Sequence, residues 1–370
     1  MDDKCKKLGI LTFHYTENPG SLLQAYALKA KLSEIFEHVE IINFKNSSKT
    51  AEIVKAQYLK KYKAMGLLRY HINKISKKLR GRKIVRECDA FREKYLGISS
   101  SDKCYDEKNI RSVNKEFSGF VAGSDQIWNI RNMRFSYAYM LDFADSDKKK
   151  LSYAPSLSES VAFSEDERQK VIALLSDFSL LSSREKSGCD FISDLTQKPC
   201  KNVLDPTLLH DAQFYEKIIV SESLIKGNYT FVYQRSNDSF ITETVSNFNK
   251  NGFKTVYSPD VKIDFRNKNF VFDISPEKWL NLIKYSDRVI TNSFHGVVFS
   301  IIFKKNFWVK TINGAATNSR ILGLLRALGL EDRLFSEENP IELEKEIDYE
   351  CVYEKLVSLR SESEKYLKEF

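Results

Sequence analysis

The sequence has no hydrophobic run long enough to cross a membrane and little glycine or proline. Its apolar stretches are short, such as 297–299 and 301–303, whereas a membrane-spanning helix needs about 20 such residues. Glycine and proline together make up only 21 of the 370 residues, which excludes a collagen-like or disordered chain. The N-terminus runs directly into a strand-like stretch at 8–13, without the apolar region of a signal peptide. We therefore expect a soluble cytoplasmic protein of about two domains.

Cysteines are few and scattered. The six stand at positions 5, 88, 104, 189, 200 and 351, with no Cys-x-x-Cys pair and no histidine at metal-ligand spacing. In a cytoplasmic chain this pattern is typical of reduced thiols that fill small apolar spaces. We expect neither a zinc site nor a disulfide framework.

Positive charge is concentrated in one segment. The net charge of +8 includes a stretch from Lys55 to Arg86 with twelve Lys or Arg and no Asp or Glu, interleaved with apolar residues at helical spacing. One interpretation is a helical excursion whose apolar face packs on its own domain. Another is docking on an anionic membrane surface or glycolipid. Nucleic acid is not the expected partner, because no recognition motif accompanies the charge.

Strands alternate with helices along both halves of the chain. The first half opens with a strand at 8–13, a helix beginning near Leu22 and a strand at 39–44, a β-α-β unit. The second half repeats the alternation from 229 to 310. We predict two Rossmann-like, doubly wound α/β domains at 1–205, with a basic helical excursion at 50–95, and 206–347. A helix at 348–370 would follow and could cross back to the N-terminal domain.

Unusual polar residues follow the predicted strands, where ligands bind in open α/β sheets. The clearest case is the turn 291–296, in which Ser293 is a natural N-cap and His295 lies in the first helical turn. Helix N-termini attract anions, although a capped helix with a packed histidine is the alternative. Arg184 follows another predicted strand and suits a two-pronged contact to carboxylate or phosphate, or a surface pair with Glu185. Dinucleotide, phosphate-loop, nucleophile-elbow and zinc-protease motifs are absent.

Taken together, these stretches resemble the polysaccharide pyruvyl transferase family. The matching segments run in the family's order from residue 8 to about 330: Gly9-Ile-Leu-Thr-Phe13, Asn18-Pro-Gly-Ser-Leu-Leu-Gln-Ala-Tyr-Ala-Leu28, Gly123-Ser-Asp-Gln-Ile-Trp-Asn129, Tyr153-Ala-Pro-Ser156, Ser183-Arg-Glu185, Asp205-Pro-Thr-Leu-Leu209 and Ser293-Phe-His-Gly296. Pro155 departs from the pattern, since a smaller residue is commoner there.

The resemblance implies a glycosyltransferase-B-like pair of domains with the active site in the cleft between them. It also implies transfer of the enolpyruvyl unit of phosphoenolpyruvate onto a sugar, usually as a cyclic ketal. Under this interpretation no metal or cofactor is needed, and phosphoenolpyruvate is the donor substrate. The implied roles are His295 as general acid, with Gly296 leaving room for a ligand; Arg184, Ser293 and Gly296 at the donor; and Asn18, Gly20, Asp125, Gln126 and Trp128 on the acceptor side.

The sequence therefore predicts a ketal pyruvyltransferase of surface-polysaccharide biosynthesis, acting on a polyprenyl-linked or nucleotide-linked saccharide. Its expected location is the cytoplasm, with residues 55–86 available to hold it on the inner face of the membrane. Two alternatives stay open. One is a nucleotide-sugar glycosyltransferase of the same architecture, and the other is a non-catalytic basic module that binds membrane or nucleic acid.

Overall fold

The computed structural model describes residues 7–46, 83–157, 163–236, 238–250, 254–259, 271, 274–312 and 318–370. The chain divides into two compact units, one formed by Met1–Pro206 with Tyr366–Phe370 and the other by Thr207–Lys365. The predicted basic segment 55–86 lies outside the described residues except for 83–86, which are helical. Within the described ranges, no helix is both long and apolar enough to span a membrane.

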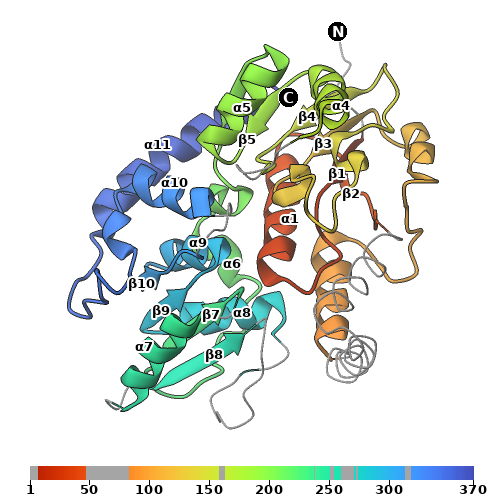
Figure 1. The fold of residues 1–370 in the computed structure, drawn as a ribbon. Coiled ribbons are helices and arrows are strands. Elements are labelled where there is room, and N and C mark those ends of the chain that lie inside the picture. The colour runs from red at the N-terminus through yellow and green to blue at the C-terminus, as the bar shows by residue number, and fades with distance from the viewer. Residues whose placement is uncertain are drawn as a thin grey trace, which may run out of the picture. The chain divides into compact units, whose positions relative to one another are not determined.

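The first unit is built on a parallel four-stranded sheet in the order β2-β1-β3-β4 (Figure 1). The strands are β1 (Leu8–Leu11), β2 (Val39–Ile41), β3 (Gly119–Ala122) and β4 (Lys149–Ser152). Helix α1 (Pro19–Leu32) connects β1 to β2. A parallel pair follows, β5 (Leu181–Ser183) with β6 (Cys200–Asn202), accompanied by α4 (Glu165–Ser176) and α5 (Lys186–Thr196). Because the main sheet is parallel, the carboxyl ends of β1, β3 and β4 share one edge.

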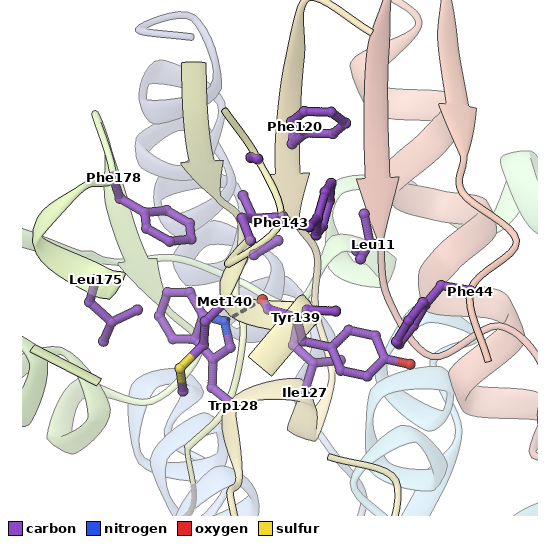
Figure 2. Close-up of a cluster of buried hydrophobic side chains, with 14 of the residues drawn as sticks. Leu11, Phe44, Phe120, Ile127, Trp128, Tyr139, Met140, Phe143, Leu175 and Phe178 are labelled. Atoms are coloured by element: carbon purple, nitrogen blue, oxygen red, sulfur yellow. Dashed lines mark hydrogen bonds between the residues drawn. The ribbon is translucent and has the colours of Figure 1, made fainter. Parts of the chain in front are cut away.

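The core of the first unit is rich in aromatic side chains (Figure 2). Trp128 is fully buried among them, and its indole N–H donates to the Tyr139 carbonyl at 2.9 Å. The Tyr139 ring in turn packs edge-on against Phe13 and Phe44, with centroid distances of 5.1 and 5.3 Å. Trp128 was predicted on the acceptor side, and the structure places its ring inside this core.

The second unit contains another parallel sheet, in the order β10-β9-β7-β8. Its strands are β7 (Thr230–Gln234), β8 (Thr255–Pro259), β9 (Arg288–Thr291) and β10 (Asn306–Val309). Its helices are α6 (Ala212–Glu216), α7 (Ser239–Lys250), α8 (Pro276–Lys284), α9 (Phe294–Ile302), α10 (Asn318–Leu328) and most of α11 (Tyr349–Leu367). Two parallel sheets with connecting helices confirm the predicted Rossmann-like α/β class.

The helix boundaries follow from local capping chemistry. Ser164 and Glu167 form the predicted capping box of α4, in which each side chain accepts from the other residue's backbone N–H. Ser275 caps α8 and Pro276 occupies its first position, where a missing N–H costs nothing. Polar residues that hydrogen-bond to the free backbone N–H groups at a helix start can be recognised in the sequence. Here they predict the starts of α4 and α8 correctly.

The C-terminal helix α11 contributes to both units. In the second unit the Tyr353 hydroxyl donates to the Ile302 carbonyl at 3.0 Å. From Tyr366 onward the chain groups with the first unit, where the Tyr366 hydroxyl donates to the Ser152 carbonyl at 2.8 Å.

Candidate active site

The loop after β1 carries the first cluster of predicted site residues. Asn18 caps α1, because its Oδ1 accepts from the backbone N–H of Gly20 at 3.1 Å. Its Nδ2 donates to Ser21 Oγ at 3.0 Å, and Ser21 Oγ donates to Asp125 Oδ2 at 2.6 Å. The structure thus brings Asn18, Gly20 and Asp125, predicted from separate motifs, into one hydrogen-bonded group.

Asp125 is held in a backbone conformation that side-chain-bearing residues rarely adopt. Its φ is 78° and its ψ is −178°, and such a conformation persists only where the surroundings enforce it. The Ser156 N–H donates to the Asp125 carbonyl at 2.8 Å, and Asp125 pairs with Pro155 in an isolated parallel bridge. The Gln126 N–H donates to Asp125 Oδ1 at 2.8 Å. This enforced geometry aims the carboxylate at the first turn of α1, and strain of this kind concentrates at functional sites.

The start of α1 therefore faces a carboxylate of the protein itself. In many α/β proteins the positive end of the first helix holds a phosphate group of the ligand. Here Asp125 contacts Ser21 in that first turn and is only 8% exposed. This edge of the sheet is consequently suited to a ligand that donates hydrogen bonds, such as a sugar hydroxyl, rather than to a second anion.

Arg184 lies in a buried ion-pair network in the same unit. Its NH1 donates to Asp205 Oδ2 at 2.7 Å, and its Nε lies 3.5 Å from Glu185 Oε1. The Ser124 hydroxyl also donates to Asp205 Oδ2, at 3.1 Å. Burial by itself lowers the pKa of Arg184, but the carboxylates of Asp205, Glu185 and Asp125 together raise it. The predicted Arg184–Glu185 pair is present but buried, and the shorter contact is to Asp205.

The loop that carries Arg184 is fixed on both sides. The Ser183 hydroxyl donates to the Pro155 carbonyl at 3.0 Å, which links the loop to the residues after β4. Asn202 in β6 donates from Nδ2 to the Arg184 carbonyl at 3.0 Å. Because its backbone is tied down, Arg184 presents its guanidinium from a rigid position.

Three carboxylates act on the Arg184 guanidinium. Asp205, Glu185 and Asp125 all favour the charged form of Arg184. A phosphorylated ligand would have to approach Arg184 against these carboxylates, whereas hydroxyl groups could donate to them. Asp205 was quoted only as part of a family-like segment, and its ion pair with Arg184 was not predicted.

In the second unit, the turn between β9 and α9 has the predicted capped geometry. Ser293 Oγ accepts from the backbone N–H of Gly296 at 3.3 Å, and the Ser293 N–H donates to Thr291 Oγ1 at 3.0 Å. A Cβ on Gly296 would lie 2.5 Å from Thr291 Oγ1. The Thr291 side chain therefore fills the space on the Cβ side of Gly296, and the predicted room for a ligand does not lie on that side.

Asn292 joins this turn to the neighbouring strand end. Its Oδ1 accepts from the backbone N–H of Arg235 at 2.7 Å, and its Nδ2 donates to the Ser236 carbonyl at 2.9 Å. Both partners follow β7, which is adjacent to β9 in the sheet. Asn292 thus brings Arg235 to the edge of the sheet where α9 begins, a link that sequence spacing did not reveal.

His295 occupies the first turn of α9 and is 7% exposed. Its ring packs edge-on against Phe294 with a centroid distance of 5.3 Å, and the guanidinium of Arg320 lies 5.8 Å from the Phe294 ring centroid. The positive end of a nine-residue helix and a nearby guanidinium give this turn the opposite electrostatic character to the Asp125 network. Within the described residues, no cluster of three or more His, Cys, Asp or Glu could hold a metal ion.

The fold of the chain resembles that of proteins with known structures. It is similar to the crystal structure of a protein assigned as a UDP-N-acetylglucosamine 2-epimerase from Listeria monocytogenes, with 10% identity, a TM-score of 0.52, and coverage of 98% of this chain and 91% of that one. The UDP-GlcNAc 2-epimerase of Neisseria meningitidis gives 8% identity, a TM-score of 0.49, and coverage of 98% and 92%. The likeness to the Listeria monocytogenes structure, with its TM-score of 0.52, concerns the fold alone. The chain thus has the predicted glycosyltransferase-B-like fold.

Sequence comparison identifies the family within that class. No curated protein matches the chain. The family model for polysaccharide pyruvyl transferase matches residues 18–313, a span that includes both the Asn18–Asp125 group and the His295 turn. The chain belongs to the polysaccharide pyruvyl transferase family, as its motifs predicted.

Proposed function

We propose that this protein transfers the enolpyruvyl unit of phosphoenolpyruvate onto a saccharide and closes it as a ketal. The family match over residues 18–313 is the observation that carries the proposal. The opposite charge character of the two polar clusters supports it, because this reaction joins a trianionic donor to a hydroxyl-bearing acceptor.

The chemistry requires one proton donor and one group that receives protons. Protonation of the donor's methylene carbon generates an oxocarbenium-like centre at C2, which a sugar hydroxyl attacks. The C–O bond to phosphate breaks, and a second hydroxyl closes the ketal. Of the two hydroxyl protons, one balances the new methyl group and the other leaves with inorganic phosphate. A positioned acid accelerates such a step by about 10²–10⁴-fold.

We assign the proton donor to His295. It lies in the first turn of α9, with Arg320 close to the neighbouring Phe294 ring. A phosphate or carboxylate bound at this turn would lie beside the imidazole, within reach of its proton. Ser293 and the backbone of this turn would hold the donor, while the Gly296 N–H is used by the Ser293 cap.

We assign the acceptor to the network around Asn18 and Asp125. The Asp125 carboxylate is positioned by Ser21 and by the Gln126 N–H. Carboxylate oxygens accept from sugar hydroxyls and receive the proton that an attacking hydroxyl releases. Trp128 supports this loop from the core rather than by touching the sugar.

Two roles compete for Arg184, namely contact with the donor and the internal ion pair. We propose that it contacts the donor's carboxylate or phosphate, since a planar guanidinium suits both. Asp205 and Glu185 already pair with it, and the competing role is this internal ion pair alone. Arg184→Lys separates the two roles. Loss of apparent affinity for phosphoenolpyruvate supports donor contact, and unchanged affinity restricts Arg184 to the ion pair.

The acceptor is proposed to be a polyprenyl-linked saccharide of surface-polysaccharide synthesis. The basic segment 55–86, most of which lies outside the described residues, supports this because twelve cations with no carboxylate suit an anionic membrane. A nucleotide-linked saccharide is the other acceptor to be tested.

Phosphate release tests the donor directly. Purified protein is given phosphoenolpyruvate with a polyprenyl-linked or a nucleotide-linked saccharide, and inorganic phosphate is measured with and without acceptor. The proposal predicts acceptor-dependent phosphate release from phosphoenolpyruvate. UDP-GlcNAc replaces phosphoenolpyruvate in a parallel reaction, and release of UDP there alone would identify a nucleotide-sugar glycosyltransferase instead.

A further inference from the structure

Two cysteines lie side by side in the first unit, outside the residues assigned to catalysis. Cys189 is in the first turns of α5 and Cys200 is the first residue of β6. Their Sγ atoms are 3.2 Å apart, and the two thiols are not joined. Cys189 is 4% exposed, whereas Cys200 is half-buried. The scattered sequence positions gave no indication of this contact.

The surroundings of the pair are rigid. The Cys189 N–H donates to the Glu185 carbonyl at 3.0 Å within the helix, and Cys200 pairs in register with Leu181 of β5. A disulfide bond is about 2.05 Å long, so the two sulfur atoms need to approach by only about 1 Å. Secondary structure on both sides holds them close, which favours reaction with each other over reaction with an external thiol.

We propose that Cys189 and Cys200 are an oxidation site that forms an intramolecular disulfide when the protein meets a peroxide. Peroxide reaches Cys200, the more exposed sulfur, and oxidises its thiol to a sulfenic acid with release of water. The Cys189 thiol then attacks that sulfur, a second water leaves, and the S–S bond forms. In total two thiols lose two protons and two electrons, and one hydrogen peroxide becomes two waters.

The bond would join α5 to β6 beneath the loop that carries Arg184. Glu185 is the N-cap residue of α5, and Asn202, two residues after Cys200, donates to the Arg184 carbonyl. The cross-link therefore joins α5, which follows this loop, to β6, which holds the loop through Asn202. The hydrogen bond to Cys189 and burial raise the pKa of the Cys200 thiol, and since the thiolate is the reactive form, oxidation here is slower than at an exposed cysteine.

Peptide mass spectrometry detects the disulfide bond directly and needs no activity assay. Trypsin does not cut between Lys198 and Pro199, so both cysteines lie in one peptide, 187–201. The whole protein is treated with hydrogen peroxide, denatured, alkylated with iodoacetamide and digested without reductant. We expect this peptide to lose two hydrogens and take up no alkyl group, and to recover two alkyl groups after dithiothreitol.

Matched variants make the outcome specific. In Cys200→Ser the peptide should never show the internal two-hydrogen loss, whereas Cys104→Ser, which removes an exposed cysteine, should leave it unchanged. The thermal midpoint of the oxidised wild type should rise and that of oxidised Cys200→Ser should not, because the cross-link restricts the unfolded chain. Two alkyl groups on peptide 187–201 after prolonged peroxide treatment, well beyond the time that fully oxidises the exposed Cys104 and Cys351, would overturn the proposal.

Discussion

His295 combines a buried ring with a position at the positive end of a helix. It is 7% exposed and follows the N-cap Ser293 by two residues. A helix N-terminus attracts anionic groups, such as the phosphate or carboxylate of the proposed donor. The position of His295 therefore suits proton transfer to a donor bound at this turn.

Replacing His295 should affect turnover more than binding. We expect His295→Ala to lower the turnover rate by about 10²–10⁴-fold, the range for loss of a positioned acid. Apparent affinity for phosphoenolpyruvate should fall much less, since the backbone of the turn remains. His295→Gln keeps hydrogen bonding without proton donation and should be nearly as slow as His295→Ala. Near-normal turnover in the Gln variant would make His295 a positioning residue.

His14 is a buried histidine whose protonation opposes folding. It is fully buried, with Nδ1 3.0 Å from the Thr12 carbonyl, and burial lowers its pKa to about 4. The pKa of an unperturbed histidine, which applies to the unfolded chain, is 6.5. Between pH 4 and pH 6.5 the unfolded chain therefore binds more protons than the folded one. Stability is therefore undiminished above pH 6.5 and falls as the pH drops towards 4, by about 2 kcal/mol at pH 5 from this residue.

Urea unfolding at pH 7 and pH 5 measures this contribution. We expect the wild type to lose more stability between these pH values than His14→Gln, by about 2 kcal/mol. The Gln variant will be less stable at pH 7 through lost packing, but that loss does not depend on pH. Equal pH dependence in the two proteins would mean that His14 is not kept neutral by the fold.

At the scale of elements, the start of α9 depends on close packing against the end of β9. Gly296 has no room for a Cβ, because Thr291 Oγ1 would lie 2.5 Å away and itself donates to the Tyr233 carbonyl. Gly323, in α10 of the same unit, is exposed, and a Cβ added there would meet no other part of the described chain within 4 Å. The two helical glycines thus differ in the space around them.

The same substitution should have opposite effects at these two positions. Gly296→Ala should destabilise the protein by about 1–3 kcal/mol through overpacking and should slow turnover by shifting His295. Gly323→Ala should stabilise it by about 0.5–1 kcal/mol, because alanine is the better helix former. Urea unfolding of both variants is the measurement. Similar stability changes at the two sites would show that the Thr291 contact does not constrain the turn.

Local chemistry made many elements predictable. The N-caps Ser164 and Ser275 and the alternation of strands and helices are encoded by neighbouring residues, and the structure follows them. Helix α5 was not predicted, because no capping side chain marks its start at Glu185. The contact of Ser21 with Asp125 joins residues 104 positions apart. The pairing of β1 with β3 brings these two residues together, so the spacing of residues along the sequence could not predict their contact.

Family-like motifs predicted more of the candidate site than hydrophobic periodicity did. The predicted strands placed Asn18, Asp125 and Arg184 at strand ends and the motifs gave their implied roles, and the structure joins these residues through hydrogen bonds and electrostatic interaction. They did not reveal that Asp205 neutralises Arg184, or that Thr291 fills the space beside Gly296. Both facts depend on side-chain packing.

At the scale of the whole molecule, the unevenly distributed charge is the feature that bears on location. Twelve of the 58 basic residues lie in 55–86, a segment with no acidic residue. Each basic side chain near an anionic bilayer contributes about 1 kcal/mol, and salt screens that attraction. We therefore expect recovery of the protein with anionic vesicles, and a decline as salt rises.

Vesicle co-sedimentation tests this expectation. Replacing several Lys and Arg of 55–82 with Gln should abolish recovery, whereas the same number of changes among basic residues elsewhere on the surface should have little effect. Equal recovery with neutral and anionic vesicles would exclude electrostatic docking through this segment.

The proposed pyruvyl transfer is tested most directly by analysing the surface glycans of the cell. Cells lacking the gene are complemented with the wild type or with His295→Ala, and mass spectrometry compares their surface saccharides. We predict a pyruvate ketal on one sugar in cells carrying the wild type and its absence in both the deletion strain and the His295→Ala strain. Identical glycans in the deletion and wild-type strains, under conditions in which the protein is expressed and folded, would contradict the assignment of this chain as a ketal pyruvyltransferase.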